Sequence, residues 1–180
     1  MEKNIWGWVI GAFVIGGIVG YVIAPATRQA QQAPQPTANV EQNKALARRV
    51  FEETDKGNLA AFDELFTDDY LFHFPGNPKP LNKEEHKQFV VAFRAAFPDV
   101  KHTVEDQVAE GDKVTSRGFF KATHKGEFQG IKATDKPVEV TFTLTNRFVS
   151  GKIAEEWVHF DSAGLLQQVG VIPPPAQPGG

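Results

Sequence analysis

Residues 152–170, KIAEEWVHFDSAGLLQQVG, decide how the fold of this chain is interpreted. The first half alternates as a β-strand does, which predicts that one face carries Ile153, Glu155, Trp157, His159 and Asp161. The second half predicts a short amphipathic helical turn over residues 162–169 that closes over the end of the strand. A carboxylate two residues from a histidine, with an indole two residues further back, suits a small catalytic cavity.

The composition favours one globular domain with an apolar interior. The chain has 180 residues, of which 41% are hydrophobic, and it holds 15 Phe against 2 Tyr. A net charge of −3 and the lack of any basic run exclude a nucleic-acid partner. The chain has no Cys, which excludes disulfides, a thiol nucleophile and a thiolate metal site.

The N-terminal segment predicts a membrane anchor over residues 1–24. Residues 5–24 form an uncharged, mostly apolar run, and a helix of about 20 residues spans the roughly 30 Å of a bilayer core. Lys3 before this run and Arg28 after it slightly favour a cytoplasmic N-terminus and an extracytoplasmic domain. The alternative is a signal peptide cleaved near Ala24-Pro25-Ala26, which would give a secreted protein.

The remaining chain divides into a linker, a folded domain and a tail. Residues 25–39 are rich in Pro and Gln and lack any period, so we expect a disordered linker, and residues 173–180 are expected to be a disordered tail. This leaves residues 40–172 as the folded domain.

Within that domain the pattern predicts three helices and a curved antiparallel sheet. Capping-box signals at Asn39 and Asn82 start the first and third helices, and Asn58 is expected to cap a short second helix. A short strand over 70–74 precedes the third helix, and four strand-like runs cover 102–109, 114–123, 138–149 and 152–160. We therefore expect an α+β fold in which sheet and helices form a cone around a cavity.

Asp161 and His159 are the candidate catalytic residues. Inside an apolar cavity the Asp161 carboxyl would gain a raised pKa and could act as a general acid or base. Asp161 could equally cap the following helical turn, a role that Asp often fills. His159 shares its face and could hydrogen-bond Asp161 or a ligand, although a structural hydrogen bond is the alternative for this residue.

Further side chains are candidates for the cavity wall, each with a structural role as its alternative. The expected substrate-binding residues are Trp157, His86, His73, Phe89, Phe93 and His124. His124 lies between Gly-containing bends and could instead anchor its loop by backbone hydrogen bonds. His102 and Asp106 share a face with Val104 and Val108, which fits either a pocket or a partly exposed sheet. We expect no metal and no cofactor, because no metal-ligand, GxGxxG or P-loop spacing is present.

The chain resembles the SnoaL-like polyketide cyclases, also called ester cyclases, of the nuclear transport factor 2-like superfamily. Residues 43–76, 86–114, 123–131 and 151–170 carry the resemblance, which covers about residues 40–170. The family's final E-x-W-x-x-x-D pattern is present as Glu155, Trp157 and Asp161, or with Glu156, one residue nearer the Trp, in the acidic position. Characterised members use a companion His on the neighbouring strand, but residues 141–147 hold none, so His159 is the candidate for that role.

The resemblance implies an α+β cone with a deep hydrophobic pocket, a small hydrophobic ligand and a possible homodimer. It also implies cofactor-independent acid–base chemistry on a carbonyl-type substrate, with the acid/base role on Asp161. Because this superfamily hosts enzymes and binding modules alike, the alternative is a non-catalytic small-molecule-binding or protein-interaction domain held at the membrane.

Overall fold

The computed structural model describes residues 11–15, 18–22 and 36–173, which fall into two units, 1–35 and 36–180. In the first unit, β1 (Gly11–Ile15) and β2 (Ile18–Val22) pair antiparallel. For residues 11–15 and 18–22 this corrects the predicted helix over residues 5–24, whose other residues lie outside the described part of the chain. The two segments are rich in Val, Ile, Phe and Tyr, which favour strands. No helix of the described part of the chain is long and apolar enough to cross a membrane.

The second unit is built on one five-stranded sheet with the order β3-β7-β6-β5-β4. Its strands are β3 (Phe66–His73), β4 (Lys101–Glu110), β5 (Lys113–Thr123), β6 (Pro137–Val149) and β7 (Lys152–Phe160). Strand β3 pairs parallel with β7, and the other three pairings are antiparallel. Tight turns at residues 111–112 and 150–151 join β4 to β5 and β6 to β7, with positive φ at Gly111 and Gly151.

Within residues 36–173, which the structure describes, four helices accompany the sheet: α1 (Pro36–Lys56), α2 (Ala61–Leu65), α3 (Lys83–Ala96) and α4 (Ser162–Val169). Helix α1 begins at Pro36 rather than at Asn39, because Pro is well suited to the first turn of a helix. The capping box of Asn82 and Glu85 is confirmed, whereas α2 has no side-chain cap. Asn58 instead donates a hydrogen bond to Glu53 over 2.6 Å.

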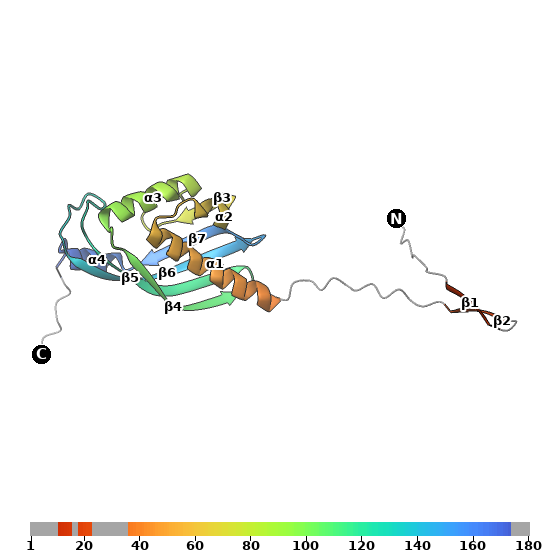
Figure 1. The fold of residues 1–180 in the computed structure, drawn as a ribbon. Helices are drawn as coiled ribbons and strands as arrows, with labels where there is room; N and C mark the ends of the chain where they lie inside the picture. Colours follow the sequence, from red (N-terminus) through yellow and green to blue (C-terminus); the bar gives the residue numbers. More distant parts are fainter. Residues whose placement is uncertain (1–10, 16–17, 23–35, 174–180) are drawn as a thin grey trace, which may run out of the picture. The chain divides into compact units, whose positions relative to one another are not determined.

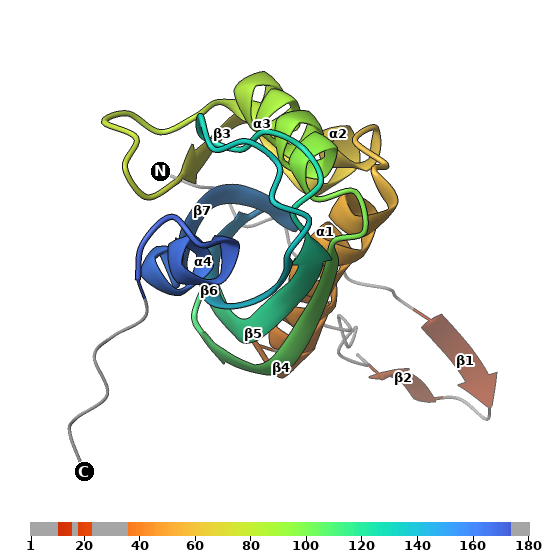
Figure 2. The ribbon, with the colours of Figure 1, turned by 90° about the vertical axis from the view of Figure 1, so that its left-hand side faces the viewer.

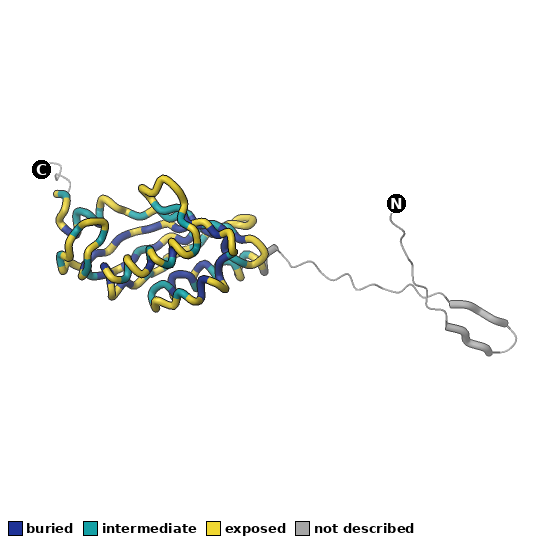
Figure 3. Tube along the Cα trace, turned by 90° about the horizontal axis from the view of Figure 1, so that it is seen from above, coloured by how far each residue is buried: buried dark blue, intermediate teal, exposed yellow. Residues whose placement is uncertain are grey.

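The sheet curves, and its concave face meets α1 and α3 in a core made mostly of aliphatic and Phe side chains (Figures 1 and 2). Buried and exposed residues alternate along β5 and β6, so only one face of these strands contributes to the core (Figure 3). The expected α+β cone is therefore confirmed for the second unit, with α4 as a fourth helix beside β6.

Candidate active site

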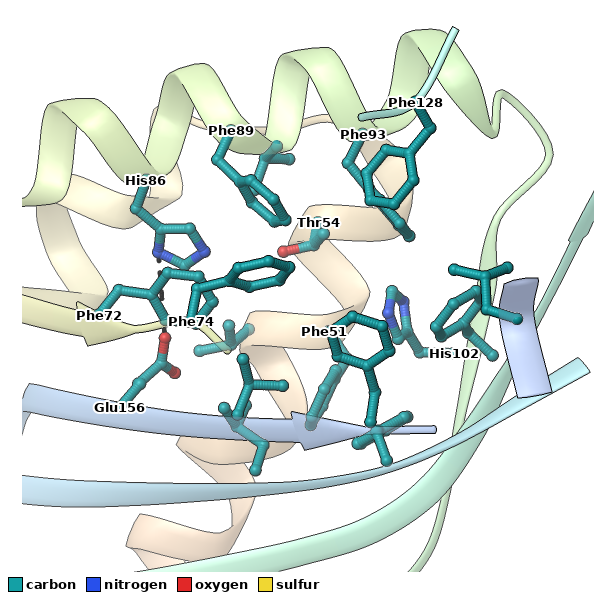
Figure 4. Close-up of a pocket in the computed structure, with 18 residues that line it drawn as sticks. Phe51, Thr54, Phe72, Phe74, His86, Phe89, Phe93, His102, Phe128 and Glu156 are labelled. Atoms are coloured by element: carbon teal, nitrogen blue, oxygen red, sulfur yellow. Dashed lines mark ion pairs between the residues drawn. The ribbon is translucent and has the colours of Figure 1, made fainter. Parts of the chain in front are cut away.

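An apolar cavity of about 110 Å³ lies inside the cone. Nine of its eighteen lining residues are Phe, supplied by α1, β3, α3, β5, β6, β7 and the connecting segments (Figure 4). Four lining residues have polar side chains: Thr54, His86, His102 and Glu156. A few polar groups on otherwise apolar walls are typical of a binding pocket for a small organic molecule.

A buried hydrogen-bond network occupies one end of the cavity. The Tyr70 hydroxyl lies 2.9 Å from Nδ1 of His86 and donates a hydrogen bond to Oε2 of Glu156. The Asn146 side chain donates to Oε1 of Glu156 over 2.5 Å. The side chains of Tyr70, Glu156 and Asn146 are almost completely buried, and that of His86 is 7% exposed.

Burial controls the protonation of this network. It raises the pKa of Glu156 to about 7, although the hydrogen bonds from Tyr70 and Asn146 act in the opposite direction. Burial also lowers the pKa of His86 to about 3. Near neutral pH the Glu156 carboxyl can therefore hold or release a proton, while the His86 ring stays neutral.

A second polar pair, His102 and Asp55, lies at the other end of the cavity. Nδ1 of His102 is 2.6 Å from Oδ1 of Asp55, and the His102 backbone N–H donates to Oδ2 over 3.0 Å. Burial disfavours the Asp55 carboxylate, but these hydrogen bonds and Lys101 outweigh burial and hold its pKa below the ordinary value. An ionised Asp55 accepts the Nδ1 proton of His102, which assigns the ring tautomer and leaves Nε2 as the basic nitrogen.

Both parts of this pair are fixed by the fold. Asp55 lies in the last turn of α1, where Arg94 of α3 donates hydrogen bonds to the carbonyl oxygens of Thr54 and Asp55. The His102 ring packs against three Phe rings, with ring centroids 5.4–5.7 Å apart: Phe51, Phe120 and Phe142. The histidine is thus oriented by a carboxylate and surrounded by apolar side chains.

Three of the predicted substrate-binding residues lie on the cavity wall. His86, Phe89 and Phe93 project from one side of α3, because residues three and four positions apart share a face of a helix (Figure 4). Their role in binding a substrate stays a prediction.

Asp161 and His159 lie outside this cavity. They line an open depression on the outer face of the sheet together with Arg117, Thr141 and Thr143. Asp161 is exposed and is the N-cap of α4, where its Oδ1 accepts a hydrogen bond from the Gly164 N–H over 2.8 Å. Its predicted acid/base role remains untested, and its geometry matches the alternative interpretation as a helix cap.

The pairing register of β7 with β6 turns the opposite face of β7 toward the cavity from the one that the sequence predicted. Glu156, Val158 and Phe160 of β7 face the cavity, and their cross-strand partners are Asn146, Leu144 and Phe142 of β6. The register shifts between Arg147 and Phe148, so that the neighbouring residues Ile153 and Ala154 are both buried. The set that contains Trp157 and His159 therefore does not line the cavity.

Trp157 and His73 stack on each other, and neither side chain lines the cavity. Their rings stack with centroids 5.2 Å apart. Nε2 of His73 lies 2.8 Å from Oε1 of Glu155, whose Oε2 accepts a hydrogen bond from Arg147. The substrate-binding role predicted for these two residues has no support from the cavity geometry.

His124 anchors its loop, which was the structural alternative for this residue. Its backbone exchanges hydrogen bonds with Thr134, Asp135 and Lys136, and its Nδ1 lies 3.1 Å from the Thr134 hydroxyl. The ring also lines a chamber of about 40 Å³ whose other lining residues include Phe128, Phe160 and Leu165, which the main cavity shares.

The described residues contain no group of three or more His, Asp and Glu side chains that could hold a metal ion. The sequence patterns gave no site role to Asp55, Tyr70 or Asn146, and Glu156 was only an alternative acidic residue of the family pattern. A detectable signal existed for Asn146 and Glu156, because each interrupts a row of apolar residues on the inner face of its strand. The Asp55–His102 pair joins residues 47 positions apart and carries no local signal.

Comparison with known proteins identifies the family to which this chain belongs. The profile of the SnoaL-like polyketide cyclases matches residues 45–169. The chain belongs to this family. A SnoaL-like fold of the nuclear transport factor 2-like type agrees with the curved sheet and its helices. A search of curated protein sequences finds no match.

Solved structures extend this comparison. IdmH of Streptomyces antibioticus, a candidate polyketide cyclase, is 31% identical over 72% of this chain and 99% of its own, with a TM-score of 0.66. AclR of Streptomyces galilaeus, a candidate hydroxylase, is 26% identical over 77% of this chain and 87% of its own, with a TM-score of 0.69. A SnoaL-like protein of Jannaschia sp. CCS1 shares the fold, at 21% identity over 79% of this chain and 99% of its own, with a TM-score of 0.70.

Proposed function

We propose that this SnoaL-like protein catalyses proton transfer at a carbon next to a carbonyl group, in a ring-closing or isomerising reaction of a small hydrophobic compound. The observation that carries the proposal is a histidine oriented by a carboxylate, His102 with Asp55, on the wall of an apolar cavity. Membership of the SnoaL-like cyclases supports the reaction class.

His102 has the geometry of a general base. Asp55 accepts the proton on Nδ1 and stabilises the imidazolium that forms when Nε2 takes a proton from the substrate. The enolate that remains attacks a second carbonyl carbon of the same molecule, and the proton returns to the new alkoxide oxygen. Substrate and product are isomers, and the Phe-lined walls supply orientation and exclude water.

Hydrogen–deuterium exchange of simple ketones tests the base without knowledge of the natural substrate. We expect the full-length chain to accelerate deuterium uptake at the α-carbon of propiophenone or 1-indanone in D₂O, measured by mass spectrometry. His102→Gln should slow this exchange by about 10²–10⁴-fold, the usual contribution of a general base. Propiophenone binding, followed by NMR shift perturbation, should persist.

Asp161→Asn is the matched control, because it changes the originally predicted acid/base residue outside the cavity. Exchange that survives Asp161→Asn but not His102→Gln supports the present assignment. The reverse pattern, at unchanged melting temperature, would return the catalytic role to Asp161. Binding of the ketones with no exchange above the buffer rate would favour a non-catalytic binding domain.

Asp55 acts through His102 and is a positioning residue. Asp55→Asn should lower the exchange rate and shift the pH at which exchange reaches half its maximum, because the imidazolium loses its carboxylate partner. An unchanged pH profile would contradict the pairing as a functional unit.

The uncharged run of residues 5–24 supports a further proposal, that it holds the protein at a membrane with the cone outside the cytoplasm. We expect the full chain to stay in the membrane pellet after carbonate extraction, and a variant with four Lys substitutions in this run to leave it. Release of the unmodified chain by carbonate contradicts membrane anchoring. Homodimerisation stays a prediction, which light scattering of the purified chain would test.

A further inference from the structure

Tyr70 links two titratable side chains that come from different elements of the fold. Its hydroxyl lies between Glu156 of β7 and Nδ1 of His86 of α3, and these two groups are 4.0 Å apart. Figure 4 shows the other ring nitrogen of His86, Nε2, on the side of the ring that faces the cavity. None of the residues that the structure describes forms a hydrogen bond with Nε2 of His86.

The number of protons on this link is restricted. The Tyr70 hydroxyl has one proton and two hydrogen-bond partners, so the second hydrogen bond needs a proton from Glu156 or His86. When Glu156 is ionised, Tyr70 donates to it and Nδ1 of His86 donates to Tyr70, which leaves Nε2 as an acceptor. When Glu156 is protonated, it donates to Tyr70, Tyr70 donates to Nδ1, and Nε2 carries the ring proton.

We propose that Glu156, Tyr70 and His86 form a proton relay that carries a proton between the cavity and the buried Glu156 carboxyl. Inward transfer begins when Nε2 of His86 accepts a proton from a molecule in the cavity. The Nδ1 proton moves to the Tyr70 oxygen, and the Tyr70 proton moves to Oε2 of Glu156. One N–H bond forms at Nε2, and the negative charge on Glu156 disappears as the bound molecule loses its proton.

The surroundings of the relay favour this route. Burial keeps the His86 ring neutral, with its pKa lowered to about 3, whereas the pKa of Glu156 is raised to about 7. The proton is therefore held on the carboxyl and not on the imidazole. Asn146 donates to Oε1 and leaves Oε2 for Tyr70, which fixes the oxygen at which the relay ends.

Other titratable groups near these elements are engaged elsewhere. Glu155, the neighbour of Glu156, pairs with His73 of β3 and Arg147 of β6. On α3, Lys83 and Lys87 pair with Asp63 of α2. His102 lies at the opposite end of the cavity (Figure 4), where its Nδ1 pairs with Asp55. The groups that contact Glu156 itself are Tyr70, Asn146 and His86.

The relay gives the cavity a second proton-transfer atom opposite His102. Its use in turnover rests on the proposed function, whereas the relay itself can be observed without a substrate. A substrate that spans the cavity would meet a basic nitrogen at each end, and the two ends could remove and return protons at separate oxygen or carbon atoms.

Nitrogen-15 NMR of the full-length chain labelled at histidine tests the relay. The chain has 5 His, and a His86→Gln variant identifies the His86 signals by their loss. We expect the ring proton to move from Nδ1 at pH 8.5 to Nε2 at pH 5.5, with no cationic ring between these limits. One fixed tautomer across this range, or an imidazolium at pH 5.5, would overturn the proposal.

Two variants locate the relay. Glu156→Gln and Tyr70→Phe should each abolish the tautomer exchange, and Glu155→Gln on the same strand should leave it intact. A tautomer exchange that persists in Tyr70→Phe would also overturn the proposal, because no hydroxyl then connects the two groups. Deuterium exchange of propiophenone tests the proposed function, whereas the tautomer of His86 tests the relay. If no deuterium exchange is found, the NMR result still decides whether the relay exists.

Discussion

Replacing Glu156 by Gln should change the pH dependence of folding in a direction set by His86. Burial raises the pKa of Glu156 from 4.5 to about 7, so at pH 5 the folded chain holds a proton that the unfolded chain has mostly released. The stability from this group is therefore present at low pH and is lost as the pH rises through 7. The opposite holds for His86, whose pKa falls from 6.5 to about 3, because the unfolded chain binds its proton first as the pH falls.

The magnitudes follow from about 1.4 kcal/mol per pKa unit. Between pH 8 and pH 5, the folded chain holds the Glu156 proton and the unfolded chain does not over roughly two pH units, which stabilises the fold at pH 5 by about 2.5 kcal/mol. For His86 the unfolded chain holds the proton and the folded chain does not over about 1.5 pH units, which destabilises the fold at pH 5 by about 2 kcal/mol. These two groups nearly offset each other in the unmodified chain. Glu156→Gln leaves the His86 contribution alone, so its free energy of unfolding should rise by about 2 kcal/mol from pH 5 to pH 8. The same change in the unmodified chain is a fall of about 0.5 kcal/mol, so the two chains should differ by about 2.5 kcal/mol over this range.

Urea unfolding followed by circular dichroism at pH 5, 6, 7 and 8 measures this difference. Glu155→Gln is the matched control on the neighbouring residue. The pKa of Glu155 is below 4.5, since His73 and Arg147 outweigh its burial, and this substitution should leave the slope unchanged between pH 5 and 8. If the curves of Glu156→Gln and the unmodified chain stay parallel within about 0.5 kcal/mol, the assignment of the buried proton to Glu156 is wrong.

Two further substitutions test the fold around the site. Asp161→Ala removes the N-cap hydrogen bond to Gly164, so the free energy of unfolding should fall by about 0.5–2 kcal/mol while deuterium exchange of propiophenone continues; a loss of exchange at full stability would contradict the cap assignment. Gly118→Ala would place a methyl carbon 2.0 Å from the Thr103 carbonyl oxygen, where β4 and β5 pair. Thermal denaturation should show a loss of about 1–3 kcal/mol, and unchanged stability would show that the two strands can separate at no cost.

The sequence pattern predicted most of the domain's elements because their signals are local. The Asn82–Glu85 capping box, the apolar stripe of α3 and the hairpin glycines each depend on residues within one or two turns of the chain. The helix predicted over residues 5–24 had an equally local hydropathy signal, but β-branched residues in the same segment also suit the strands β1 and β2.

The candidate site was harder to predict because strand faces and distant pairs depend on tertiary structure. Along β7, two sets of alternating residues compete, and the set with Trp157 and His159 holds the more reactive side chains. The other set lines the cavity, because Val158 and Phe160 lie beside Leu144 and Phe142 of the neighbouring strand β6. On β4, a register shift between Val104 and Asp106 separates His102, on the cavity wall, from Val108, which is 68% exposed.

The position of β7 inside the sheet affects how the domain can form during synthesis. This strand is the last of the sheet to leave the ribosome, yet it pairs with both β3 and β6. Until residue 160 has emerged, β3 has no partner strand in the sheet and β6 has an open edge, so a nascent chain exposes two strand edges to other chains. Tyr70 meets Glu156 only after this step, and the polar end of the cavity therefore depends on the last strand made.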